Sequence, residues 1–102
     1  MRVLVVCAGG LSSSLLVSSM EKHARPGEVV EAHGEGSVSR FIHDVDVVLV
    51  APQVAFKKDA IEALAKPLGV PVGLIPGTAY GMMDGLAAMT TARALLAADR
   101  IS

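Results

Sequence analysis

The chain has 102 residues, of which 52% are hydrophobic and 3% aromatic, and its formal net charge at pH 7 is −1. This length suits one domain with a core that needs neither disulfides nor metals, so we expect a single domain over residues 1–102. The scarcity of aromatic residues and the lack of a basic run argue against a nucleic acid partner. The single cysteine, Cys7, excludes an intramolecular disulfide, and no apolar run reaches the roughly 20 residues that cross a membrane.

The chain opens on a predicted strand, a loop and a helix. Residues 3–7 form a continuous apolar run, which is typical of a central parallel strand that is buried on both faces. Residues 8–12 predict a loop, and residues 13–23 predict a helix with apolar side chains at a spacing of four. Ser12 is a suitable N-cap for that helix, and the Pro-Gly pair at 26–27 ends it.

The middle of the chain predicts two more strands. Residues 29–33 have the pattern of a strand with polar interruptions, which favours an edge position. Residues 46–50 form a second apolar run, and we expect a central strand there. Between these strands the sequence predicts a loop with a short helix near residues 37–42.

The last part predicts a helix, a strand and a second helix. Residues 54–65 have a helical pattern, residues 70–75 predict a fourth strand, and residues 76–78 predict a turn. One long helix is expected from Tyr80 or Gly81 to residue 98.

This alternation predicts an α/β fold with three layers: a four-stranded parallel sheet with helices on both faces. Right-handed crossovers favour the strand order 2-1-3-4. In such sheets ligands bind at the carboxyl ends of the strands, where the winding reverses. The fold prediction therefore indicates Cys7, the loop over residues 8–14 and the Pro52-Gln53 pair as the candidate site.

The residues after Cys7 suit an anion. Two adjacent glycines allow the backbone to turn with its N–H groups pointing inward, and three serines add hydroxyl donors. The helix that follows directs its free N–H groups and its positive dipole end to the same place. This field favours the nucleophilic thiolate, so the pattern predicts a site where cysteine becomes phosphorylated. Each feature alone is usually structural, but all of them fall within eight consecutive residues.

Three segments carry a resemblance to a known family. Residues 7–17, Cys-Ala-Gly-Gly-Leu-Ser-Ser-Ser-Leu-Leu-Val, resemble the phosphocysteine loop of the enzyme IIB component of bacterial sugar phosphotransferase systems, in the lactose/cellobiose/chitobiose branch. Residues 52–56 resemble that family's Pro-Gln-Val/Ile-Ala-Tyr, with Phe56 in place of Tyr. Residues 80–85 resemble its Tyr-Gly-x-x-Asp-Gly.

The resemblance implies a cytoplasmic phosphoryl carrier that needs no cofactor. Its cysteine would accept a phosphoryl group from a phosphohistidine of the IIA component. It would then donate the group to a sugar, such as cellobiose, chitobiose or lactose, bound by the membrane IIC component. The chain itself would not insert into the membrane and would reach its inner face only through IIC. Cys7 is the implied catalytic residue, and the implied phosphate-binding residues are Ala8, Gly9, Gly10, Leu11, Ser12, Ser13 and Ser14. Pro52, Gln53, Tyr80 and Asp84 are candidate partner or site-lining residues, although for Asp84 we favour a capping role in the last helix.

Other functions remain as alternatives. A small cysteine phosphatase would need an Arg at the sixth position after the cysteine, where this chain has Ser13, and an Asp general acid. A nucleotide-binding or phosphate-binding module is less well supported, because the glycines fit neither Gly-x-Gly-x-x-Gly nor the P-loop. A redox protein would need a second cysteine. The three histidines, His23, His33 and His43, fall on different predicted elements, and no metal site is expected.

Overall fold

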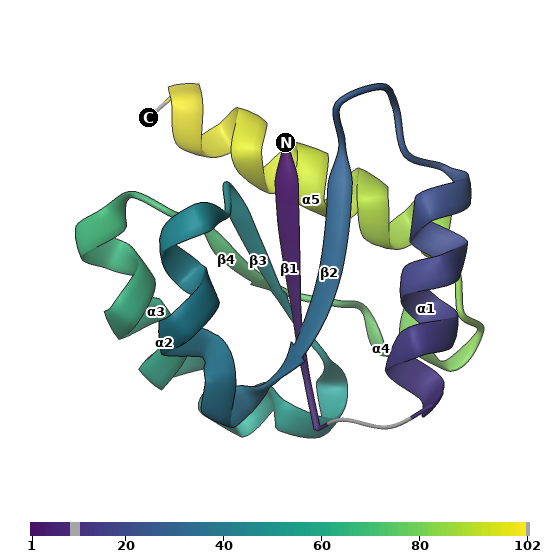
Figure 1. Ribbon diagram of the computed structural model, residues 1–102, viewed down its shortest axis with the longest axis horizontal. Helices are drawn as coiled ribbons and strands as arrows, with labels where there is room; N and C mark the ends of the chain where they lie inside the picture. The colour runs from purple at the N-terminus through teal and green to yellow at the C-terminus, as the bar shows by residue number, and fades with distance from the viewer. Residues whose placement is uncertain (9–10, 102) are drawn as a thin grey trace.

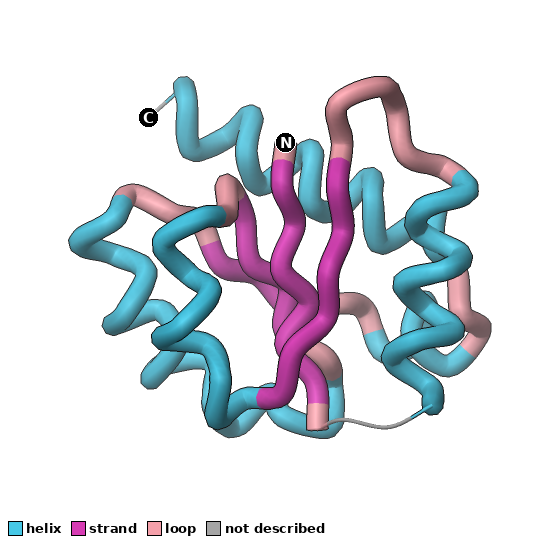
Figure 2. Tube along the Cα trace, in the orientation of Figure 1, coloured by secondary structure: helices cyan, strands magenta, loops and turns pink. Residues whose placement is uncertain are grey.

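The computed structural model describes residues 1–8 and 11–101. Its centre is a four-stranded parallel sheet in the order β2-β1-β3-β4, with helices on both faces (Figure 1, Figure 2). The strands are β1 (Arg2–Cys7), β2 (Val29–Gly34), β3 (Val47–Val50) and β4 (Val72–Leu74). The predicted α/β class, layer arrangement and strand order are confirmed.

The helices divide between the two faces of the sheet. The α-helices are α1 (Leu11–Lys22), α2 (Val38–Phe41), α3 (Lys58–Ala65), α4 (Gly77–Gly81) and α5 (Gly85–Ile101). Short 3-10 turns join them: η1 (Glu35–Ser37), η2 (Ile42–Asp44), η3 (Pro52–Lys57) and η4 (Lys66–Leu68). Helices α1 and α5 pack against each other on one face, and α2 and α3 lie on the other (Figure 1).

The two central strands form the most buried part of the core. In β1 the side chains of Val3, Leu4, Val5 and Val6 have no exposed surface, and neither do those of the four β3 residues. Both strands are covered by helices on each face, which explains why their sequences are continuously apolar rather than alternating. Burial of this apolar surface is the main force that holds the sheet between its helices.

Strand register decides which face each side chain occupies, because successive side chains point to opposite faces. Val5, Leu49 and Gly73 are paired across three strands and share one face. A Cβ at Gly73 would lie 2.5 Å from a methyl carbon of Leu95, so α5 covers that face. Cys7 is two residues beyond Val5 and therefore faces α1 and α5.

The opposite face carries a different side-chain cluster. His33 is paired with Val6 and points away from the face that Cys7 occupies. Its ring stacks on Phe41 of α2, with the ring centroids 3.5 Å apart. The face of the sheet under α2 and α3 is thus separated from the thiol by the sheet itself.

Several predicted boundaries are wrong. Ser12 was expected to cap the first helix, but α1 begins at Leu11 and Ser12 is its second residue. The turn predicted at 76–78 is instead the start of α4 at Gly77. The single long helix after it is two helices, because Met83 adopts a left-handed conformation with φ of 53° and ends the first one. The fourth strand, β4, covers Val72–Leu74 and is shorter than the predicted range of residues 70–75.

Candidate functional site

The carboxyl ends of β1, β2 and β3 lie at the lower edge of the sheet in Figure 2. The Ala51 amide donates to the carbonyl oxygen of Val6 at 2.9 Å, and the Ile75 amide donates to that of Val50 at 2.9 Å. The residues that follow β1, β3 and β4 are therefore level with one another. The winding reverses between β1 and β3, because α1 and α3 lie on opposite faces of the sheet. This edge is the expected place for a ligand.

Cys7 is the last residue of β1 and is almost fully buried, with 3% of its surface exposed. Its thiol donates a hydrogen bond to the carbonyl oxygen of His33 on β2, with a sulfur–oxygen distance of 3.5 Å. Since a thiolate has no proton to donate, this contact belongs to the protonated thiol. The sulfur must give up both the proton and this hydrogen bond when it acts as a nucleophile.

Helix α1 begins four residues after Cys7. The N–H groups of its first turn have no partner within the helix and carry partial positive charge, as an anion site requires. Ser13 is buried, whereas Ser14 and Ala8 are exposed. Gly9 and Gly10 lie outside the described residues, and so do the side chains of Leu11 and Ser12.

The structure places Pro52 and Gln53 just beyond the end of the strand next to β1. They begin η3, which is separated by one residue, Ala51, from the end of β3, and β3 pairs with β1. Pro52 is half-buried and Gln53 is exposed. The Cys7 and Gln53 segments therefore share one edge of the sheet, in line with the sequence prediction.

Tyr80 and Asp84 belong to the junction between α4 and α5. Tyr80 is buried in α4. The Asp84 carboxylate accepts a hydrogen bond from the Ala87 amide at 3.1 Å, so it caps the first turn of α5. The expected capping role of Asp84 is thus confirmed.

One contact near this junction escaped the sequence analysis. Gly85 lies so close to α1 that a Cβ there would be 2.2 Å from the carbonyl carbon of Ser19. The Gly85 amide also donates to the Ser19 hydroxyl at 3.0 Å. The glycine in the Tyr-Gly-x-x-Asp-Gly segment was the available signal, although nothing in the sequence identifies its partner.

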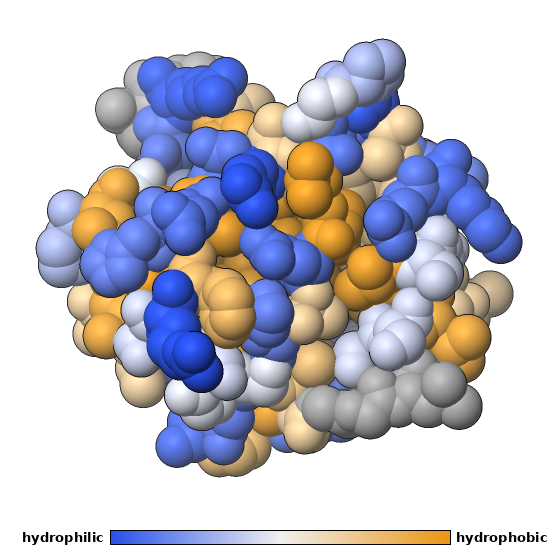
Figure 3. Space-filling view, in the orientation of Figure 1, coloured by the Kyte–Doolittle hydropathy of each residue, from blue (hydrophilic) through white to orange (hydrophobic). Residues whose placement is uncertain are grey.

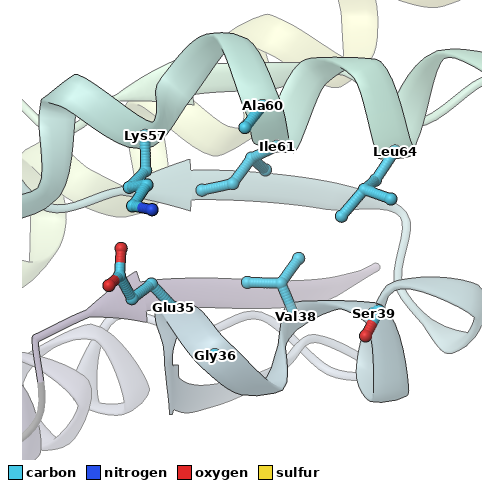
Figure 4. Close-up of a pocket in the computed structure, with 8 residues that line it drawn as sticks. All are labelled: Glu35, Gly36, Val38, Ser39, Lys57, Ala60, Ile61 and Leu64. Carbon is cyan, nitrogen blue, oxygen red and sulfur yellow. The ribbon is translucent and has the colours of Figure 1, made fainter.

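A cavity of about 200 Å³ lies elsewhere, between α2 and α3. Figure 4 shows Glu35 and Lys57 extending toward each other at one end of it, while Val38 and Ile61 face each other further in. It lies on the face of the sheet opposite to that of the thiol, and we do not assign it to the site at Cys7. Hydrophilic and hydrophobic side chains are interspersed over the surface of the α2 side (Figure 3).

The described part of the chain shows neither a metal site nor a membrane-spanning helix. Within residues 1–8 and 11–101, no group of three or more His, Cys, Asp or Glu side chains is arranged to hold a metal ion. No helix in that part of the chain has the length and apolar character to cross a membrane.

Comparison with known proteins gives consistent matches. Residues 2–91 match the family model described as "PTS system, Lactose/Cellobiose specific IIB subunit". An oligo-beta-mannoside-specific EIIB component from Bacillus subtilis is 35% identical, and the match covers 93% of this chain and 95% of that protein.

A solved structure and a longer relative extend the comparison. The solution structure of a cellobiose-specific phosphotransferase IIB component from Borrelia burgdorferi is 35% identical, with a TM-score of 0.79 over 97% of this chain and 94% of that one. A lactose-specific EIICB component from Lactococcus lactis is 36% identical over 76% of this chain, which corresponds to 14% of that protein.

Proposed function

Because the chain belongs to the lactose/cellobiose-specific IIB family of the phosphotransferase system, and is a phosphotransferase component, we propose that Cys7 is the residue that carries the phosphoryl group. The observation that carries this proposal is the position of Cys7. It is the only cysteine of the chain and ends a central strand where the winding of the sheet reverses, four residues before a helix N-terminus. Family membership favours this carrier over a cysteine phosphatase or a nucleotide-binding module.

The proposed chemistry has two displacements at phosphorus. In the first, the Cys7 sulfur bonds to the phosphorus of a phosphohistidine and the P–N bond breaks, while the thiol proton passes to the leaving imidazole nitrogen. In the second, a sugar hydroxyl oxygen attacks the phosphorus, the S–P bond breaks, and the hydroxyl proton passes to the sulfur. Each step moves one proton and one phosphoryl group, so no redox partner is involved.

We assign the phosphoryl oxygens to the backbone N–H groups of residues 8–14. The start of α1 within this segment supports the assignment, because the amino end of a helix carries the partial positive charge that stabilises a dianion. The segment contains no Arg or Lys. Backbone donors can hold the group without the bidentate arginine clamp that a phosphatase uses to promote attack by water.

The donor in this proposal is a IIA component and the acceptor is a sugar bound by a membrane IIC component, at the cytoplasmic face of the membrane. The lactose-specific relative carries the designation EIICB, which supports a working partnership with IIC. The relatives are named for oligo-beta-mannoside, cellobiose and lactose. We therefore propose a β-linked disaccharide as the sugar class.

Mapping the phosphorylated residue tests the proposal. The protein is incubated with labelled phosphoenolpyruvate, enzyme I, the phosphocarrier protein HPr and a IIA component of this family, and the label is located. We expect one label, on Cys7, and none on Cys7→Ser. A label on His23, His33 or His43, or one that persists in the variant, contradicts the assignment.

Discharge of the label tests the carrier role. Membranes that contain a IIC component of the same family should remove the label from the phosphorylated protein when sugar is added, and each disaccharide can be compared in turn. Turnover of p-nitrophenyl phosphate by the protein alone is the matched assay for a phosphatase. Rapid Cys7-dependent turnover without sugar-dependent discharge would replace the carrier with a phosphatase.

A further inference from the structure

The contact between Ser19 and Gly85 joins two helices at an unusual place. Gly85 is the first residue of α5, so its amide is one of the orphan donors of that helix. The Asp84 carboxylate, from the residue just before α5, accepts a hydrogen bond from the Ala87 amide at 3.1 Å. The Gly85 amide is shared between two acceptors: the carbonyl oxygen of Met83 at 3.1 Å and the hydroxyl of Ser19, 66 residues earlier in the chain, at 3.0 Å. Helix α1 therefore supplies part of the cap of α5.

The two helices are also in direct backbone contact at this point. A Cβ at Gly85 would lie 2.2 Å from the Ser19 carbonyl carbon and 2.3 Å from the Met20 nitrogen. These atoms of Ser19 and Met20 belong to the backbone, which cannot move aside as the tip of a side chain can. The lack of a side chain at Gly85 therefore sets how closely α1 and α5 approach each other. The hydrogen bond of the Ser19 hydroxyl also restricts the rotation of α1 about its own axis, because only one rotation brings the hydroxyl to the Gly85 amide.

Helix α1 transmits this constraint to the site. It is a continuous helix from Leu11 to Lys22, and Ser19 lies eight residues after its start, about 12 Å along the axis. By strand register Cys7 is on the same face of the sheet as Gly73, which α5 covers, and α1 packs against α5. A rotation or tilt of α1 at Ser19 therefore moves the amino end of the helix, which begins four residues after Cys7.

We propose that Ser19 is a positioning residue for phosphoryl transfer at Cys7, acting through its hydrogen bond to Gly85. The inference rests on the proposed function of Cys7. Ser19 touches neither the thiol nor a substrate; it sets the angle at which α1 presents its N-terminal amides. The glycine at 85 is required because any side chain would force the helices apart, and the hydroxyl at 19 fixes the rotation that remains.

The test compares Ser19→Ala with Ser18→Ala, an exposed neighbour on the same helix. The first measurement is the rate at which Cys7 accepts the phosphoryl group from a phosphorylated IIA component. The second is the rate of Cys7 alkylation by iodoacetamide as a function of pH, which does not depend on a partner. We expect Ser19→Ala to slow acceptance by about fivefold or more and to shift the alkylation profile, since small misplacements of a positioned group are costly. Ser18→Ala should match the wild type, and Ser19→Thr, which keeps the hydroxyl, should restore most of the rate.

Thermal unfolding of each variant separates positioning from stability. A Ser19→Ala protein that melts earlier but keeps the wild-type rate and alkylation profile overturns the proposal and leaves Ser19 a stabilising contact only. Asp84→Ala loosens the same junction from the α5 side, and it decides the matter in the same way if Ser19→Ala does not fold. A wild-type protein that accepts no phosphoryl group on Cys7 would refute the proposed function instead.

Discussion

The ion pair between Glu28 and Arg93 links the segment before β2 to α5, across 65 residues of sequence. Two hydrogen bonds join the side chains, from Nε to Oε2 at 3.1 Å and from Nη2 to Oε1 at 2.7 Å, and Nη2 also donates to the His23 carbonyl oxygen at 2.8 Å. Only 10% of the Glu28 side chain and 19% of the Arg93 side chain are exposed. We predict that Glu28→Gln, which keeps the shape and removes the charge, destabilises the protein in a pH-dependent way.

The magnitude follows from the pKa of Glu28. The hydrogen bond from Arg93, and to a smaller extent the Arg25 amide, lower that pKa from 4.5 to about 2 against the opposing effect of burial. A difference of this size corresponds to at most about 3.4 kcal/mol of folding free energy, and we expect about 2 kcal/mol after allowance for solvent screening. Because the folded-state pKa is depressed, this stability is present above pH 4.5 and is lost as the pH falls toward 2.

Urea unfolding at a series of pH values measures the effect. At pH 7 we expect Glu28→Gln to lower the free energy of unfolding by about 2 kcal/mol, and we expect the gap from wild type to shrink by about half or more at pH 3. Arg100→Ala, a change of an exposed arginine on the same helix, should stay within about 0.5 kcal/mol of wild type. A gap of equal size at pH 7 and pH 3 would refute the reasoning, because an uncharged contact would then account for the loss.

Three further changes test the packing of the fold. Gly85→Ala should lower the free energy of unfolding in urea by about 2 kcal/mol or more, because the new Cβ meets the α1 backbone. The control Gly81→Ala, with no atom within 4 Å of its Cβ, should leave that free energy nearly unchanged, and equal effects of the two changes would contradict the clash at Gly85. Gly73→Ala should lower the melting temperature less than Gly85→Ala does, because the atoms that its Cβ meets belong to the flexible side chain of Leu95. A lower melting temperature for Gly73→Ala than for Gly85→Ala would contradict this. Phe41→Ala should cost about 2 kcal/mol by losing the ring that stacks on His33, and an unchanged midpoint in urea would show that the stack contributes nothing.

The architecture could be predicted from local patterns. The runs at residues 3–7 and 46–50 are apolar at every position, and this signal identifies a strand that is buried on both faces. Once the strands and helices alternate, the handedness of crossovers leaves few topologies and favours the order β2-β1-β3-β4, which the structure confirms. The same reasoning placed Cys7 and Gln53 at one edge of the sheet, because the carboxyl ends of neighbouring parallel strands lie together.

Tertiary structure alone decided the contacts that join distant segments. Nothing near Glu28 indicates that Arg93 will neutralise it, and nothing near Ser19 indicates that the Gly85 amide will reach its hydroxyl. Each pair joins residues 65 or more positions apart, which only the packing of the α5 segment against the first part of the chain brings together. The break before α5 was also missed, since Met83 adopts a left-handed conformation that its residue type does not favour. Periodicity in a sequence reports which face of an element is buried, whereas the partner that buries it is set by the packing of the whole chain.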